Sequence, residues 1–211
     1  MDSDVNGVLL IGASGLAREV LAAGIEGAVG ILDDDESRHG QIIGGVPVLG
    51  AVASAAARAE DLLITIGPSG ARRKVVAMLA ALGVADERFA TFVSTGVRLG
   101  ATSVVGRGSV ILDGTVITAD AAIGRHVVVM PNCTITHDDV IADFATLAAG
   151  VSLGGTVRVG EAAYIGMNAS VRQQLSIGPN ATVGMGSVVL GDVPASQTWA
   201  GVPARELGVQ A

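Results

Sequence analysis

The sequence predicts two parts, an α/β unit followed by a parallel β-helix, and three observations predict them. Short apolar strands alternate with helices over residues 7–92. An aliphatic residue then stands at every sixth position, from Val93 to Val189. The 211 residues are 50% hydrophobic, yet they include 30 Gly and only five aromatic residues. Such hydrophobicity argues against disorder, and so much glycine argues against a helical bundle.

The α/β unit is expected to open with a strand over 7–11, a glycine turn over 12–15 and a helix over 16–23. A second strand over 28–32 ends at three consecutive aspartates. The elements expected after it are a helix over 51–59, a strand over 62–66 and a helix over 69–82. Because strands alternate with helices, we expect a parallel sheet with right-handed crossovers.

The second part has an aliphatic residue at 17 positions with a period of six and no phase slip. This hexapeptide pattern is typical of a parallel β-helix. Each unit is one short strand and a corner, and its aliphatic residue stacks on those of neighbouring coils at about 4.8 Å. Gly follows the aliphatic residue in eight units, where it is expected to supply the positive φ of a corner.

Charge and composition exclude several classes of protein. The net charge of −7 disfavours nucleic acid and anionic membranes as partners. The longest uncharged runs are interrupted by polar residues, Gly or Pro, so we expect no membrane insertion. The N-terminus has no basic segment of a secretory signal, and a single cysteine excludes an internal disulfide framework or a cysteine zinc cluster. We therefore expect a cytoplasmic protein without a metal.

His137 is the strongest candidate for chemistry. It is one of only three histidines and lies two residues after an inward aliphatic position. Imidazole is a suitable base near neutral pH for acyl transfer to an amine or a hydroxyl. Asp138 is expected to orient the ring and stabilise its protonated form. The alternative is a solvated histidine beside solvated acids.

Gly155 follows His137 by three hexapeptide units. In known hexapeptide proteins three units close one triangular coil, which would place Gly155 one coil from His137 at the same corner. Its backbone N–H would then be able to donate to a thioester carbonyl and the oxyanion that develops on it. The alternative is that Gly155 is only a corner glycine.

The turn Gly12-x-x-Gly15 is a candidate phosphate site. A strand, a glycine turn and a helix N-terminus form an arrangement that binds anions, although the full dinucleotide fingerprint is absent. An acid after the second strand, such as Asp33, often contacts a ribose. A tight turn without a ligand and a solvated acidic segment are the alternatives.

Five motifs together resemble the family of bacterial sialic acid O-acetyltransferases and nucleotide-amino-sugar N-acetyltransferases. The motifs are 11–15, 30–35, 45–50, His137-Asp138 with 140–141 and 143–144, and 201–205. The resemblance covers nearly the whole chain. It implies a Rossmann-like sugar-nucleotide-binding domain over 1–90. A left-handed β-helix acyltransferase domain with a C-terminal cap follows over 91–211. It also implies a homotrimer with acetyl-CoA between adjacent helices.

The resemblance also implies roles for particular residues. His137 is the base, Asp138 its partner and Gly155 the acetyl-binding amide. The residues implied for acetyl-CoA binding are Thr146, Gly155, Met167, Gly184, Gly201 and Arg205. The residues implied for sugar-nucleotide binding are Gly12, Ser14, Gly15, Asp33, Asp34 and Asn132. The segment 199–205 is also expected to cover the open end of the β-helix.

Three positions depart from the family pattern. Leu16 and Thr146 stand where many members have histidine, and Met130 stands where some have asparagine. The predicted reaction is transfer of acetyl from acetyl-CoA to the amino group of a nucleotide-linked 4-amino-deoxysugar. An O-acetyltransferase of a sialic acid-like sugar remains an alternative, as does a non-catalytic trimeric scaffold or sugar-nucleotide sensor. The nucleotide and the sugar stay open.

Overall fold

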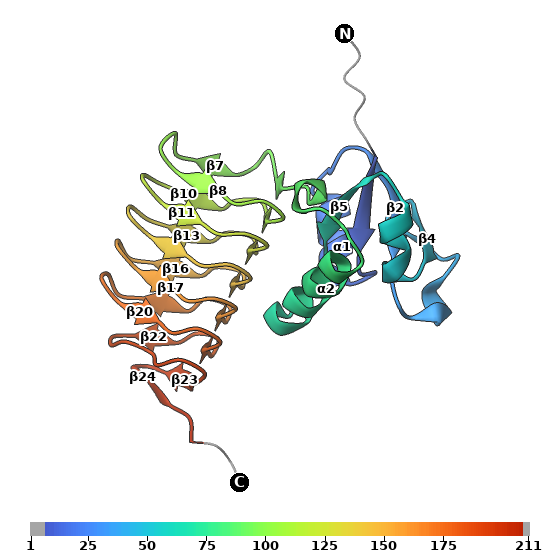
Figure 1. The fold of residues 1–211 in the computed structure, drawn as a ribbon. Helices are drawn as coiled ribbons and strands as arrows, with labels where there is room; N and C mark the ends of the chain where they lie inside the picture. The colour runs from blue at the N-terminus through green and yellow to red at the C-terminus, as the bar shows by residue number, and fades with distance from the viewer. Residues whose placement is uncertain (1–6, 209–211) are drawn as a thin grey trace. The chain divides into compact units, whose positions relative to one another are not determined.

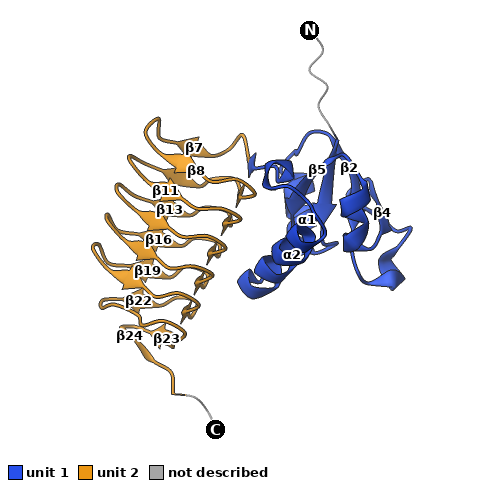
Figure 2. Cartoon of the chain, viewed as in Figure 1, with its two compact units in different colours: residues 1–92 blue, residues 93–211 orange. Residues whose placement is uncertain are grey.

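The computed structural model describes residues 7–208. The chain divides into two compact units whose boundary lies between Phe92 and Val93 (Figure 2). No helix in the described range 7–208 has the length and apolar content needed to cross a membrane.

The first unit is built on a five-stranded sheet with the order β3-β4-β2-β1-β5. Its strands are β1 (Val8–Ile11), β2 (Ala28–Leu32), β3 (Ile42–Ile43), β4 (Val46–Gly50) and β5 (Asp61–Ile64). The predicted parallel sheet is confirmed: β1 pairs in parallel with β2 and with β5, and β4 extends the parallel sheet next to β2. All four residues of β1 are buried, as expected for a central parallel strand.

Two α-helices and three short 3-10 helices complete the first unit over its described residues, 7–92. They are α1 (Gly15–Ala22), α2 (Ser69–Ala81), η1 (Glu36–Arg38), η2 (Val52–Ala57) and η3 (Asp86–Arg88). The helix expected over 51–59 is a 3-10 helix instead of an α-helix. Its N-cap residue is Ala51, whose side chain cannot cap the helix. Strands β3 and β4 have no counterpart among the predicted strands, and Pro47 within β4 is unusual for a strand paired on both sides.

The second unit begins with 17 strands of two residues, in which the second residue is the predicted aliphatic one. They are β6 (Phe92–Val93), β7 (Arg98–Leu99), β8 (Val104–Val105), β9 (Val110–Ile111), β10 (Val116–Ile117), β11 (Ala122–Ile123), β12 (Val128–Val129), β13 (Thr134–Ile135), β14 (Val140–Ile141), β15 (Thr146–Leu147), β16 (Ser152–Leu153), β17 (Arg158–Val159), β18 (Tyr164–Ile165), β19 (Ser170–Val171), β20 (Ser176–Ile177), β21 (Thr182–Val183) and β22 (Val188–Val189).

These strands form three parallel sheets that wrap one core, and the coils stack in a single column (Figure 1). Ile117 pairs with Ile135, three hexapeptide units further on, so three units make one coil. From Ile111 onwards every predicted aliphatic position is at most 3% exposed. The hexapeptide period thus predicted the parallel β-helix and the identity of its core residues.

The glycines that follow the aliphatic positions have a different role from the expected one. The positive φ values at most corners belong two residues further along, to side chains such as Asp138 (φ 62°) and Asn168 (φ 56°). An ideal Cβ at Gly160 would lie 2.5 Å from the backbone nitrogen of Pro179, and one at Gly166 would lie 2.6 Å from that of Met185. Glycine is needed there because the backbone of the next coil passes too close for a side chain.

The chain ends in a hairpin of β23 (Thr198–Gly201) and β24 (Ala204–Glu206). Strand β23 pairs in parallel with β21, which extends that sheet by the hairpin. Ala204 is 1% exposed in the core, and Trp199 packs against the same cluster. The hairpin therefore packs on the core cluster beside the last coil.

Candidate active site

His137 lies in the corner that joins β13 to β14. The backbone of this corner is bonded to both neighbouring coils. The Asp138 amide donates to the Ala119 carbonyl at 3.1 Å, and the His137 carbonyl accepts from the Thr156 amide at 2.9 Å. The β-helix therefore holds the backbone that carries His137 from both sides.

The side chains of His137 and Asp138 form a pair. Asp138 has a positive φ of 62°, a conformation that aspartate tolerates better than most residues. Its Oδ2 lies 2.7 Å from Nδ1 of His137. An ionised carboxylate can only accept, so Nδ1 carries the hydrogen and Nε2 of the neutral ring keeps its lone pair. The side chains are 64% and 57% exposed, so Nε2 is available to a substrate.

Asp138 also sets the basicity of His137. Its hydrogen bond to the ring raises the pKa of His137 above the ordinary value of 6.5, against a smaller opposing effect of desolvation. We expect Asp138→Asn to lower the pKa of His137, because an amide does not stabilise the imidazolium as a carboxylate does. An NMR titration of the imidazole measures this value. A midpoint unchanged in the variant would contradict the pairing.

Gly155 lies beside the free nitrogen of the ring. An ideal Cβ on Gly155 would lie 2.5 Å from Cε1 of His137 and closer still to Nε2. The Gly155 carbonyl accepts from the Gln174 amide at 2.9 Å, whereas its own amide has no hydrogen-bond partner within residues 7–208. The predicted juxtaposition of His137 and Gly155 is thus present, with an amide donor close to a base.

The corner contains a further acidic residue that the sequence analysis did not single out. Asp139 is 0% exposed. Its Oδ2 accepts from the Thr136 amide at 2.7 Å, and its Oδ1 accepts from the Val157 amide at 2.8 Å. Burial raises the pKa of Asp139 to about 6. The sequence did contain a signal for Asp139, which is a charged residue at a core-facing position of the repeat.

Four other predicted residues lie on other parts of the coil. Thr146 is a buried residue of β15, in a different sheet from β13 and β14. Met167, Gly184 and Asn132 belong to the corners that follow β18, β21 and β12. These residues therefore do not share a corner with His137 in the same chain.

Hydrogen bonds to neighbouring segments hold the glycine turn of the first unit. The Ala13 amide donates to Oδ2 of Asp33 at 2.6 Å, and the Ser14 hydroxyl donates to the Thr65 carbonyl at 2.6 Å. The Ser14 oxygen also accepts from the Leu16 amide at 3.0 Å, which caps α1. The amides of Ser14 and Gly15 have no partner in the described part of the chain, so they remain as donors for an anion.

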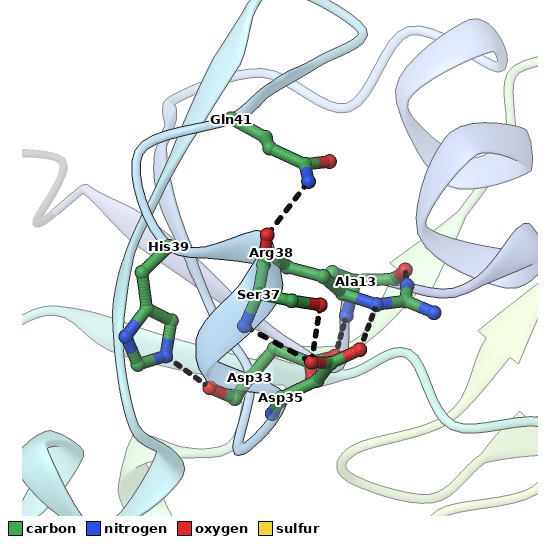
Figure 3. Close-up of polar contacts among 7 residues, drawn as sticks. All are labelled: Ala13, Asp33, Asp35, Ser37, Arg38, His39 and Gln41. Atoms are coloured by element: carbon green, nitrogen blue, oxygen red, sulfur yellow. Dashed lines mark hydrogen bonds and ion pairs between the residues drawn. The ribbon is translucent and has the colours of Figure 1, made fainter.

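Polar side chains gather beside Ala13 of this turn (Figure 3). The Arg38 guanidinium lies between the Ala13 carbonyl and the Asp35 carboxylate and bonds both. The second oxygen of Asp33 accepts from the Asp35 amide at 2.9 Å. Asp34 accepts from the Val52 amide at 2.9 Å and so caps η2. The two predicted acids, Asp33 and Asp34, therefore shape the loops at this end of the sheet.

The remaining candidates, Arg205 and Gly201, have structural contacts, and so do Cys133 and His126, which were not candidates. Arg205 donates to the Ala204 carbonyl at 2.9 Å, and the Gly201 amide donates to Ser187 at 3.2 Å, both in the terminal hairpin. Burial raises the pKa of the Cys133 thiol to about 11, which keeps it protonated. The buried ring of His126 stacks on Phe144 with centroids 5.2 Å apart. Residues 7–208 contain no cluster of three or more metal-ligating side chains.

Several solved structures are similar to this chain over nearly its whole length. The acetyltransferase domain of PglB from Neisseria gonorrhoeae FA1090 is 29% identical, with 96% of this chain and 100% of that chain covered, at a TM-score of 0.86. The same domain has also been solved in complex with acetyl coenzyme A, at a TM-score of 0.86.

PerB from Caulobacter crescentus, in complex with CoA and GDP-perosamine, is 28% identical, with 97% of this chain and 98% of that chain covered, at a TM-score of 0.87. WeeI from Acinetobacter baumannii AYE is 30% identical, with 95% of this chain and 99% of that chain covered, at a TM-score of 0.81. No protein-family model and no curated protein matches the chain.

Proposed function

Because the chain belongs to the hexapeptide-repeat family of sugar acetyltransferases, we propose that it transfers acetyl from acetyl-CoA to the amino group of a nucleotide-linked 4-amino-deoxysugar. The observation that carries this proposal is the His137–Asp138 pair, whose free ring nitrogen adjoins Gly155 with its unpaired amide. The similar PerB structure contains both CoA and GDP-perosamine, which supports the choice of donor and acceptor.

Each of the three corner residues has one task in the reaction. Nε2 of His137 takes a proton from the amine as its nitrogen attacks the thioester carbonyl. The Gly155 amide donates to the carbonyl oxygen as negative charge develops on it. Asp138 accepts from Nδ1–H and stabilises the imidazolium. The new C–N bond replaces the C–S bond, and the imidazolium returns its proton to the departing sulfur.

The acetyl donor fits this corner for a simple reason. Glycine at position 155 leaves the space beside Nε2 that a Cβ would fill, and its amide is a donor without an acceptor in residues 7–208. The donor supplies the activated acetyl group. The residues proposed for binding it are Thr146, Gly155, Met167, Gly184, Gly201 and Arg205.

The finer architecture belongs to the same proposal. Residues 1–90 form a Rossmann-like domain that binds the sugar nucleotide through Gly12, Gly15, Asp33 and Asp34, with Ser14 shaping the turn and contributing its amide. Residues 91–211 form a left-handed β-helix with acyltransferase activity. The free amides of Ser14 and Gly15 support a diphosphate at the glycine turn. Asn132 is proposed to bind the sugar.

A homotrimer is proposed on the distribution of these residues. His137 and Gly155 lie at one corner of the coil, and Met167, Gly184 and Asn132 lie at another. In a triangular prism two corners of the same chain do not face one site. The two sets of residues meet where the His137 corner of one copy lies beside the Met167 corner of the next copy. This contact between copies completes the acetyl-CoA site.

The acceptor class can be tested directly. Purified enzyme is incubated with acetyl-CoA and a panel of UDP-, dTDP- and GDP-linked amino sugars, with the free amino sugars and a sialic acid as controls, and CoA release is recorded. We expect release with at least one nucleotide-linked amine and little release with the free sugars. Release with the sialic acid alone would favour an O-acetyltransferase. No release, together with no acetyl-CoA binding by calorimetry, would favour the scaffold.

A further inference from the structure

Asp139 stands at a repeat position that is otherwise uncharged. The residues at this position, four after each aliphatic, are Val97, Ser103, Ser109, Thr115, Ala121, Val127, Cys133, Asp139, Ala145, Val151, Val157, Ala163, Ala169, Leu175, Ala181, Ser187 and Val193. Placing a carboxylate there, at 0% exposure, costs desolvation energy unless its oxygens are bonded. The one charged residue of the series lies in the corner that contains His137.

The two oxygens of Asp139 bond to opposite sides of the proposed site. Oδ2 accepts at 2.7 Å from the amide of Thr136, which is the residue before His137. Oδ1 accepts from the Val157 amide at 2.8 Å, two residues after Gly155. The carboxylate therefore links the loop that carries the base to the corner that carries the amide donor.

We propose that Asp139 is a positioning residue, whose carboxylate joins the His137 loop to the Gly155 corner and so fixes Nε2 relative to the Gly155 amide. This inference rests on the proposed acetyl transfer. It follows from the sensitivity of such reactions to geometry, since a displacement of about 1 Å can cost about 100-fold in rate. Nothing in it requires Asp139 to touch a substrate.

The titration of Asp139 gives the proposal a second test, the dependence of activity on pH. Burial raises the pKa of Asp139 to about 6, against the hydrogen bonds from the Val157 and Thr136 amides and the charge of His137, which lower it. The charge of Asp138 raises it further. One coil away, Asp120 and Arg158 are the charged residues next in sequence to Ala121 and Val157, the equivalents of Asp139, and neither shifts the pKa of Asp139. Protonation of Asp139 converts one acceptor oxygen into a hydroxyl, a weaker acceptor for an amide. Activity should therefore fall in acid through two groups, His137 and Asp139.

Two substitutions separate positioning from stability. Asp139→Asn keeps the shape but turns an NH₂ group toward one of the two amides. Asp139→Ser should keep the link to Val157, because Ser103 already accepts the Ala121 amide at 3.0 Å in the equivalent place two coils earlier, and should lose the link to Thr136. Ser103→Ala is the matched control, because it removes an inter-coil bond of the same kind away from His137.

We expect kcat to fall about tenfold or more in both Asp139 variants, with the KM for acetyl-CoA little changed. The melting temperature of the serine variant should stay close to that of the Ser103→Ala control, which should retain its kcat. Below about pH 6, the slope of log kcat/KM against pH should be steeper by one in the wild type than in the asparagine variant, because protonation of His137 and of the acceptor amine is common to both.

An NMR titration of His137 tests the inference without substrates. The wild-type ring should show a second inflection near the pKa of Asp139, about 6, which Asp139→Asn abolishes. The same variant should lower the midpoint of His137, because the charge of Asp139 raises the pKa of that ring. Losses in kcat no larger than in the Ser103→Ala control, or an unchanged His137 titration, would overturn the inference. Absence of CoA release by the wild-type enzyme with every nucleotide-linked amine would instead overturn the proposed function.

Discussion

His137→Ala is expected to lower kcat/KM by about 10³-fold, the middle of the range for loss of a general base. The reason is the position of Nε2, which belongs to an exposed side chain and lies beside Gly155. The measurement is steady-state CoA release with the nucleotide-linked amine that the acceptor panel identifies. Because alanine leaves the core untouched, the melting temperature and the affinity for acetyl-CoA should remain close to the wild-type values.

The loss should lie mainly in kcat, since the base acts in the transition state rather than in binding. Raising the pH should restore part of the rate, because a less protonated amine attacks without help. Turnover close to that of the wild type at neutral pH would remove His137 from the mechanism, whatever the variant's stability.

Gly155→Ala is expected to lower kcat by about 100-fold through geometry alone. Gly155 does not have a positive φ, so the substitution adds no backbone strain, but the new methyl group overlaps the imidazole and displaces it. Kinetics with the same acceptor measure the effect, and the His137 titration shows whether the ring still pairs with Asp138.

Gly191→Ala is the matched control for this substitution. Gly191 occupies the same position of the repeat two coils further along, and a Cβ there meets nothing within 4 Å. We expect this variant to keep its kcat. Equal activity of the two alanine variants would mean that the space beside His137 is not used by the reaction.

The β-helix could be predicted almost completely from the sequence, because one rule sets it. The six-residue period selects the inward side chains, and the structure places all 17 of them as the second residue of a strand. The pair of His137 with Asp138 was predicted from the chemistry of two adjacent residues. The proximity of His137 to Gly155 followed from the period once the coil was taken as three hexapeptide units.

Other features could not be predicted because they depend on contacts between coils. The role of Gly160 and Gly166 is set by the close approach of the next coil, which no single repeat displays. The two bonds of Asp139 join it to Thr136 in its own corner and to Val157 in the next coil, so its function appears only in the folded chain. Strand β4 is paired on both sides, with β2 and with β3, despite Pro47.

Analysis of the product tests the central claim most directly. The wild-type enzyme is incubated with acetyl-CoA and a nucleotide-linked 4-amino-deoxysugar, and the product is examined by mass spectrometry before and after treatment with hydroxylamine. We predict a product one acetyl group heavier whose acetyl survives the treatment, as an amide does, and whose formation nearly ceases in His137→Ala. An acetyl group that hydroxylamine removes, or no acetylated product with any nucleotide-linked amine, would contradict the proposed N-acetyl transfer.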